Sequence, residues 1–293
     1  MKKILVVGDL HGGSVWALSP PKYMKKHGNA FPQNEIQKHL WKNWRKFLDV
    51  VEKRQYDTLI LNGDNIDGPA YRDRGRCLMS SDMEDQVTNS ATILEELIKR
   101  GGFGEAYVLS GTDYHTSIQQ DNEAQLAKYI DAEYVGLGPF DFKVEDVSIN
   151  VSHGTGSTYW YRGTKMDKIG FAMQLNIAGG GLYDSRYIVR SHLHFRGALE
   201  YEHQSIFVVP CWQAQTDYMR KKDPLKMIPN IGSMELTIDG KEVSHRFFSY
   251  PHPPRPLKRI EGVYLGDDAR KMTREERRQR IRELEEVQKN RKI

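Results

Sequence analysis

The chain opens with Ile4-Leu5-Val6-Val7-Gly8-Asp9-Leu10-His11, an apolar run that ends abruptly at a glycine, an aspartate and a histidine. Four later runs, at 58–61, 107–109, 147–151 and 187–189, end in a similar way, at Asn62-Gly63-Asp64, Ser110-Gly111-Thr112-Asp113-Tyr114-His115, Ser152-His153-Gly154 and Ser191-His192-Leu193-His194. Apolar runs of this length are typical of buried strands. The sequence therefore predicts five strands whose carboxyl ends carry chemically active side chains.

Helical patterns separate these strands. Apolar residues recur at helical spacing over 34–54, and a second helix is predicted from a capping box of Ser81 and Glu84 to a stop at Gly101-Gly102. Shorter helices are expected at 121–131 and 166–178, and the last apolar runs, 205–209, 234–238 and 243–250, have the character of hairpins in a second sheet. Alternating strands and helices predict an α/β fold.

A proline-rich segment, Pro251-His252-Pro253-Pro254-Arg255-Pro256, divides the chain. Proline lacks the backbone donor and fixes φ, so neither a regular helix nor a central strand can cross it. We expect a folded domain over 1–255 and a charged extension over 256–293, where Thr273 and Glu276 form a capping box for a helix rich in arginine and glutamate. Such a helix can dock on a partner, including a second copy of the chain, whereas its glutamates argue against a nucleic-acid tail.

The composition excludes some classes of protein. Hydrophobic residues make up 39% and charged residues 28%, a balance typical of globular domains, and no apolar run approaches the roughly 20 residues that span a bilayer. The cysteines are Cys77 and Cys211, which favours a reducing, cytoplasmic location over a disulfide scaffold. The net charge of +4 permits an anionic substrate without requiring nucleic acid.

The polar strand endings predict a metal centre. In an open α/β sheet the loops after the strands meet in one crevice, so strands that end in Asp or His would bring those groups together. Asp9 and His11, like His192 and His194, stand two residues apart, and in extended backbone such positions face the same side. Carboxylate oxygen together with imidazole nitrogen favours a transition metal over an all-oxygen magnesium or calcium site.

The ordered set of motifs resembles the signature of the calcineurin-like metallophosphoesterase superfamily, which runs Asp-x-His, Gly-Asp-x-x-Asp, Gly-Asn-His, Gly-His and Gly-His-x-His. The resemblance covers residues 3–250, through Gly8-Asp9-Leu10-His11, Gly63-Asp64-Asn65-Ile66-Asp67-Gly68, Gly111-Thr112-Asp113-Tyr114-His115, Ser152-His153-Gly154 and Ser191-His192-Leu193-His194. It implies a four-layer α-β-β-α sandwich of two mixed sheets, and two divalent ions: manganese first, with iron, zinc, nickel or magnesium as alternatives.

The resemblance also implies a role for each matched residue. It assigns one ion to Asp9, His11 and His194, the other to His153 and His192, and both to a bridging, catalytic Asp64. His115 resembles the histidine that protonates the leaving oxygen or stabilises the charged transition state, and Asp67 would orient a ligand histidine without binding metal.

One departure concerns the family's asparagine ligand, which directly follows the glycine. This chain has Thr112-Asp113-Tyr114 between Gly111 and His115. Either Asp113 or Thr112 replaces the asparagine, or the second ion binds more weakly. Contacts to the substrate are expected from Arg72, Tyr159, Trp160 and Arg162. Packing in the core or in a lid is the alternative for residues 159–162, and a solvated charge run is the alternative for Arg72.

Together these residues predict hydrolysis of phosphate esters by a metal-activated water, with phosphodiesters preferred because a histidine acid assists a poor alkoxide leaving group. A nuclease of the same superfamily, acting on nucleotides or nucleic acid, is one alternative, favoured by the basic C-terminus and the aromatic cluster. A scaffold protein with a decayed metal site is the other, and the altered asparagine motif points toward it.

Overall fold

The computed structural model describes residues 1–26, 28, 30–70, 74–115, 121–154, 156, 161–223, 228–254 and 273–290. The chain divides into two compact units, Met1–Pro253 and Pro254–Ile293. The described part of the second unit contains helix α6 (Arg274–Asn290), whose first turn is capped by hydrogen bonds between Thr273 and Glu276. Among the described residues, no helix is both long and apolar enough to cross a membrane.

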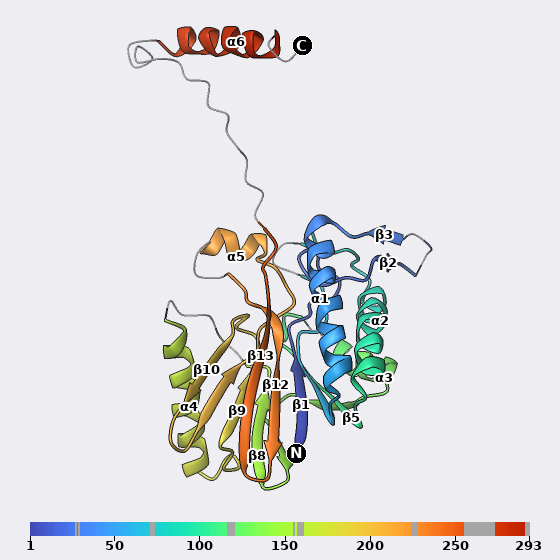
Figure 1. Ribbon diagram of the computed structural model, residues 1–293, viewed down its shortest axis with the longest axis vertical. Coiled ribbons are helices and arrows are strands. Elements are labelled where there is room, and N and C mark those ends of the chain that lie inside the picture. Colours follow the sequence, from blue (N-terminus) through green and yellow to red (C-terminus); the bar gives the residue numbers. More distant parts are fainter. Residues whose placement is uncertain are drawn as a thin grey trace. The chain divides into compact units, whose positions relative to one another are not determined.

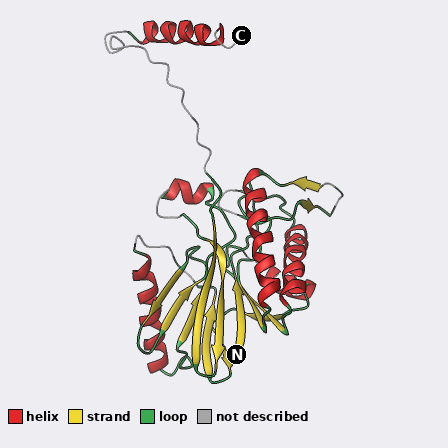
Figure 2. Ribbon diagram, in the orientation of Figure 1, coloured by secondary structure: helices red, strands yellow, loops and turns green. Residues whose placement is uncertain are grey.

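The first unit is built on a six-stranded sheet with the order β13-β12-β1-β4-β5-β6 (Figures 1 and 2). Its strands are β1 (Lys2–Val7), β4 (Thr58–Asn62), β5 (Glu105–Leu109), β6 (Glu133–Gly136), β12 (Ile231–Asp239) and β13 (Glu242–Tyr250). The first four are parallel to one another, and the β12–β13 hairpin joins β1 in antiparallel register, with Ile4 opposite Leu236.

A five-stranded sheet has the order β10-β11-β9-β8-β7. Its strands are β7 (Phe140–Val144), β8 (Val147–Ser152), β9 (Tyr187–Arg190), β10 (Gly197–Glu200) and β11 (Ser205–Val208). The three central strands are parallel, and the two edge strands are antiparallel to their neighbours. A separate two-stranded sheet is formed by β2 (Lys22–Met24) and β3 (Ala30–Pro32), and the backbone of Met24 is hydrogen-bonded to the side chain of Asn89 on helix α2 (Met83–Gly101).

The first unit also contains the helices α1 (Glu35–Arg54), α2 (Met83–Gly101), α3 (Asn122–Tyr129), α4 (Arg162–Ala178) and α5 (Asp217–Lys222). Helices α1 to α4 follow the sequence patterns closely, whereas α5 was not predicted. Helix α1 starts with a capping box between Asn34 and Gln37. The predicted cap Ser81 is wrong by one residue, because the carboxylate of Asp82 accepts the hydrogen bond from the backbone of Glu84.

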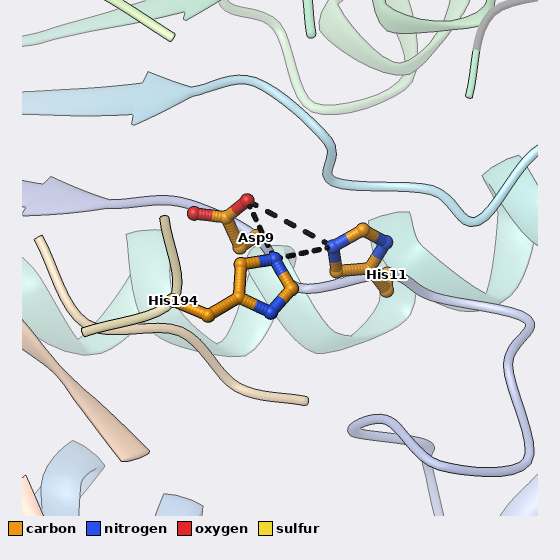
Figure 3. Close-up of side chains that lie close together, drawn as sticks. All are labelled: Asp9, His11 and His194. Atoms are coloured by element: carbon orange, nitrogen blue, oxygen red, sulfur yellow. Dashed lines mark hydrogen bonds and ion pairs between the residues drawn. The ribbon is translucent and has the colours of Figure 1, made fainter. Parts of the chain in front are cut away.

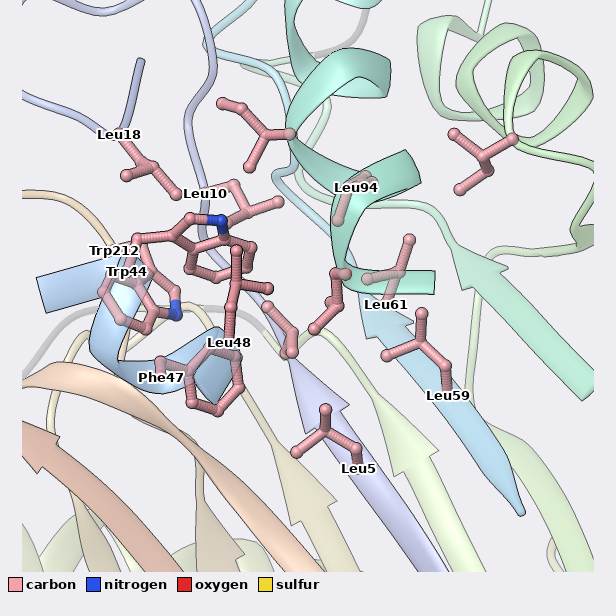
Figure 4. Close-up of a cluster of buried hydrophobic side chains, with 14 of the residues drawn as sticks. Leu5, Leu10, Leu18, Trp44, Phe47, Leu48, Leu59, Leu61, Leu94 and Trp212 are labelled. Carbon is pink, nitrogen blue, oxygen red and sulfur yellow. The ribbon is translucent and has the colours of Figure 1, made fainter. Parts of the chain in front are cut away.

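Three apolar clusters show which faces pack together. Leu5, Leu59 and Leu61 belong to one cluster with Trp44, Phe47, Leu94 and Trp212 on one face of the six-stranded sheet (Figure 4). The alternate residues Ile4, Val6 and Ile60 belong to a second cluster with Val151, Val189 and Phe207 of the other sheet. A third cluster joins Met166 and Met173 of α4 to Ile188 and Ile206.

The mixed α/β architecture with more than one sheet is as predicted. The expectation that the 234–250 hairpin belongs to the second sheet is wrong, because β12 pairs along β1 of the first. The apolar side of this hairpin, with Met234, Leu236 and Ile238, still faces the second sheet. Its alternation therefore indicated a buried face correctly but could not identify the neighbouring strand.

Candidate metal centre

The candidate ligands follow parallel strands whose carboxyl ends meet. Strands β1, β4 and β5 precede Asp9, Asp64 and His115, while β8 and β9 precede His153 and the His192-Leu193-His194 segment. Within each sheet these strands run in the same direction. The sequence-based expectation that distant parts of the chain converge here agrees with this geometry.

The backbone at most of the candidate ligands is left-handed, not extended. Positive φ angles of 48° to 65° occur at five of them: Asp9, His11, Asp64, His192 and His194. The i and i+2 pairs lie beyond the last residues of β1 and β9, so the predicted reason for their shared direction, an extended backbone, is wrong. Non-glycine residues adopt such angles rarely, and they cluster at functional sites where the surrounding fold enforces them.

One group of possible ligands contains Asp9, His11 and His194, all of which are buried (Figure 3). The Nε2 atom of His194 lies 3.1 Å from Oδ1 of Asp9 and 3.1 Å from Nε2 of His11. The same carboxylate oxygen is 3.8 Å from Nε2 of His11. Three electron-pair donors therefore point toward one another, which is the arrangement that a cation between them stabilises.

A second group contains Asp64, His153 and His192. The Nδ1 atom of His153 lies 2.7 Å from the carbonyl oxygen of Asn62. A carbonyl can only accept, so Nδ1 carries the proton and the neutral ring has a lone pair at Nε2. That Nε2 is buried without a hydrogen bond, 2.9 Å from Oδ2 of Asp64. A lone pair facing a carboxylate requires a cation, either a proton or a metal ion.

His192 is anchored through its other nitrogen. Its Nε2 lies 2.8 Å from the carbonyl oxygen of Gly156, which leaves Nδ1 as the donor atom of the neutral ring. Its backbone N–H donates to Oδ2 of Asp9 over 2.9 Å. Asp9 therefore links the two groups, and His192 is less buried than His153.

A third group contains His11, Asp64 and His115. The Nε2 atom of His115 lies 3.9 Å from Oδ2 of Asp64. Thr112 contacts the same carboxylate, since its backbone N–H donates to Oδ1 over 2.7 Å. The predicted ligand Asp113 is exposed and belongs to none of the three groups found among the described residues.

Asp67 lies behind two of the histidines. Its Oδ1 is 3.2 Å from Nδ1 of His11, and its backbone carbonyl is 2.6 Å from Nδ1 of His115. The side-chain amide of Gln213 donates to the same Oδ1 over 3.4 Å. Asp67 is therefore positioned to fix the orientation of both rings without being a member of a ligand group.

Glu123 supports the centre and has no signal in the sequence motifs. Its carboxylate, buried on α3, accepts hydrogen bonds from the backbone N–H and the side-chain amide of Asn65, at 2.7 and 2.8 Å. Burial raises the pKa of Glu123 to about 8, although the bonds from Asn65 oppose that shift. This contact ties α3 to the loop that carries Asp64.

The charges within the centre favour protons on His11 and His153 over protons on the carboxylates. Burial alone would raise the pKa values of Asp9 and Asp64, but the neighbouring histidines hold both well below their usual range. Burial would lower the pKa of His11, yet hydrogen bonds to Asp67 and Asp9 raise it to about 10. Against the effect of burial, the carboxylates of Asp64 and Asp9 raise the pKa of His153 to about 9. A metal ion must displace these protons.

The centre lines a cavity of about 1200 Å³. Its described lining residues outside the ligand groups include the cations Arg74, Arg76, Arg162, Lys221 and Lys222 and the acids Asp67, Asp217 and Asp223. The predicted contact Arg162 is among them, and its guanidinium is held by Asn230 and by the carbonyl of Ile228. The other predicted contacts, Arg72, Tyr159 and Trp160, lie outside the described residues. Sequence patterns gave no sign of α5, which contributes both lysines.

No protein-family model and no curated protein matches the chain. Among solved structures, the chain is similar to Vps29 of Entamoeba histolytica complexed with Zn²⁺, with 15% identity, a TM-score of 0.40, and coverage of 84% of this chain and 98% of that chain. An archaeal phosphodiesterase matches with 12% identity, a TM-score of 0.41 and coverage of 84% and 99%. A predicted phosphoesterase from Streptococcus pneumoniae matches with 12% identity, a TM-score of 0.38 and coverage of 87% and 93%.

Two of these proteins are described as phosphoesterases, the class that the sequence motifs resemble. Identities of 12–15% and TM-scores near 0.4 do not assign an activity.

Proposed function

We propose that this chain is a metal-dependent hydrolase of phosphate esters, with phosphodiesters preferred, and that it belongs to the calcineurin-like metallophosphoesterase superfamily. The observation that carries the proposal is the set of three overlapping ligand groups. Two of the groups contain His11, and two contain Asp64. Scattered Asp and His side chains on a protein surface would not share members or be buried to this degree. The four-layer α-β-β-α sandwich is part of the proposal, and the three apolar clusters support it.

The side chains fit two divalent ions. Asp9, His11 and His194 would hold one ion, His153 and His192 the other, and Asp64 would bridge them. The buried, unpartnered Nε2 of His153 is the donor that most needs a cation. Carboxylate and imidazole donors together suit manganese, iron, zinc or nickel better than magnesium, and manganese is our first choice.

Bound divalent ions supply a water nucleophile at neutral pH and polarise the phosphoryl oxygens. The chain's own residues supply the rest. The ionised carboxylates of Asp9 and Asp64 would bind the ions, and Asp67 holds the rings of His11 and His115 in place. The cations on the cavity wall attract the phosphate. The cavity exceeds the volume of a phosphate group, so there is room for a large leaving group.

A nuclease is the second candidate, and the cavity wall favours it. Arg74, Arg76, Lys221 and Lys222 add positive charge beyond the centre itself, where the phosphates that flank a scissile bond would lie. A scaffold with a decayed metal site is the contrasting possibility. Self-association through α6 and a cytoplasmic location stay predictions, and light scattering of the full chain tests the first.

The test uses the full chain stripped of metal with a chelator and then reloaded. With Mn²⁺ we expect hydrolysis of bis(p-nitrophenyl) phosphate, slower hydrolysis of the monoester, and none with either substrate after stripping. Single-stranded and double-stranded DNA, cyclic nucleotides and a phosphoprotein complete the panel. A chain that binds no stoichiometric metal and cleaves none of these substrates with any of the five metals would contradict the proposal and favour the scaffold.

A further inference from the structure

We propose that His115 is a ligand of the metal centre, an inference that rests on the proposed function because it presupposes that the centre binds metal. In the family that this chain resembles, an asparagine directly after the glycine would be a ligand. Here the imidazole comes from four residues after Gly111. This assignment replaces the role of proton donor predicted from the sequence for His115.

A tight turn explains how the later residue reaches the centre. The backbone N–H of His115 donates to the carbonyl of Thr112 over 2.9 Å, which closes a turn over residues 112–115. Thr112 stays beside Asp64, with its N–H bonded to the carboxylate. Asp113 lies on the outside of the turn and is exposed. The turn therefore directs Asp113 away from the centre and returns the chain to it at His115.

Close packing holds the end of this turn against the Asp64 loop. A Cβ atom added to Gly68, whose φ is +71°, would lie 2.3 Å from the backbone oxygen of His115. Only glycine permits both this φ at low cost and this approach. The backbone of His115 is thus fixed by the loop that also carries Asp64 and Asp67.

The ring of His115 is anchored in the same way as the ring of the candidate ligand His153. Its Nδ1 lies 2.6 Å from the carbonyl oxygen of Asp67, as Nδ1 of His153 lies 2.7 Å from that of Asn62. The Nδ1 atom of His11 is bonded to the carboxylate of Asp67. Metal-binding histidines commonly donate their second ring N–H to a carbonyl or carboxylate. A neutral ring anchored so presents a lone pair, and not a proton, at Nε2.

The free nitrogen lies within reach of a shared ion. Ligand bonds of about 2.0–2.2 Å allow one ion to span two donors up to about 4.4 Å apart. The Nε2 of His115 and Oδ2 of Asp64 are 3.9 Å apart, and the donor atoms of His11, Asp64 and His115 all lie within 4.8 Å of one another. His115 and Asp64 therefore meet this distance requirement, whereas the exposed Asp113 belongs to none of the ligand groups found among the described residues.

The test compares metal binding by the wild type, His115→Ala and His115→Gln, each as the full chain. We measure Mn²⁺ affinity, bound metal by elemental analysis, and the visible absorption of bound Co²⁺, which responds to coordination. His115→Ala should weaken the affinity for one ion by about 10- to 100-fold or more, since even residues behind a ligand contribute this much. His115→Gln should recover part of the loss, because its amide oxygen can coordinate metal but cannot act as an acid.

His203→Ala is the matched control, because that histidine is exposed at 85% and belongs to none of the ligand groups found among the described residues. It should leave metal binding unchanged, and circular dichroism checks that every variant folds. Full metal content and an unchanged Co²⁺ spectrum in His115→Ala, together with reduced turnover, would overturn the inference and restore the proton-donor role. Loss of metal in Asp113→Ala but not in His115→Ala would overturn it in favour of Asp113. A wild type that binds no metal contradicts the proposed function itself.

Discussion

The six-stranded sheet brings Asp9, His11, Asp64 and His115 to the centre, whereas the five-stranded sheet brings only histidines, His153, His192 and His194. Both carboxylates are almost fully buried, with 0% and 1% of their surface exposed. Across the interface between the sheets, His153 faces Asp64 at 2.9 Å and His194 faces Asp9 at 3.1 Å. The fixed negative charge therefore belongs to one sheet, and the titratable donors that meet it belong to the other.

This difference separates two kinds of contribution. The carboxylates decide whether a cation is held at all, because they are the only anionic members of the three groups. The imidazoles of the second sheet can bind either a proton or a metal ion, so protonation of these rings competes with metal binding. Substitutions on the two sheets should therefore have unequal effects.

The largest effect is expected for Asp64→Asn on the six-stranded sheet. This change keeps the shape of the side chain and removes the charge shared by two ligand groups, so we expect turnover to fall by about 10³-fold with loss of bound metal. His192→Ala on the other sheet should cost about 10- to 100-fold. Steady-state rates with bis(p-nitrophenyl) phosphate provide the comparison. Equal losses in the two variants would show that the sheets do not differ as we argue.

Gly68→Ala should disturb the donors that follow the six-stranded sheet, because the added Cβ would collide with the backbone of His115. Gly180→Ala is its matched control, because Gly180 has a similar φ of +75° but no atom within 4 Å of an added Cβ. Both variants place a side chain in the left-handed region. Only the first also collides with His115, which should cost an additional 1–3 kcal/mol or so of unfolding free energy. Denaturant titration measures this difference, and equal stabilities would contradict the close packing.

The protons on the imidazoles predict a pH dependence. The pKa of His153 is about 9 and that of His11 about 10 in the metal-free protein, above the value of about 6.5 in the unfolded chain. Their stabilising contribution is complete below pH 6.5 or so and is lost as the pH rises through about 9 to 10. A metal ion replaces these protons, so the increase in melting temperature caused by Mn²⁺ should grow between about pH 6.5 and 9.

Thermal melts with and without Mn²⁺ across this range check the prediction. Glu123, whose pKa is raised to about 8 by burial, also titrates there. It belongs to none of the ligand groups, so its contribution largely cancels between the two melts. An increase that stays constant with pH would mean that metal binding displaces no proton.

The smallest effect is expected on α5, which lies on the cavity wall and contributes no member of the ligand groups. Replacing Lys221 and Lys222 by Ala should raise KM for an anionic diester slightly, by about 0.2–1 kcal/mol per removed charge. The effect should disappear at high salt, because exposed charges are screened. Lys241→Ala in the β12–β13 turn is the control. Unchanged KM values at low salt would remove α5 from the account of substrate binding.

The sequence predicted the strands that precede the donors correctly, but it did not predict the backbone conformation that orients the donors. The apolar runs before Asp9, Asp64, His153 and His192 are strands as expected, because each run is long enough to be buried on both faces. Their donors meet because the strands are parallel. The left-handed backbone at these residues was not predictable, since an aspartate or histidine gives no local signal for it.

Other features depend on contacts between distant residues. The place of His115 depends on Gly68 and Asp67, more than 40 positions away. Helix α5, with six residues, is too short to show a helical repeat. The buried Glu123 resembles an ordinary acidic residue in a first helical turn, and only the fold shows that Asn65 lies beside it.

The left-handed backbone at five donors has a consequence for how such a centre changes over generations. Holding an aspartate or a histidine in this conformation costs about 1–3 kcal/mol per residue. In a descendant under no selection for ion binding, glycine at positions 9, 11, 64, 192 and 194 would relieve this backbone strain. These five positions should then be among the first to drift, so aspartate and histidine retained there in distant descendants would mark lineages in which the chemistry is still under selection.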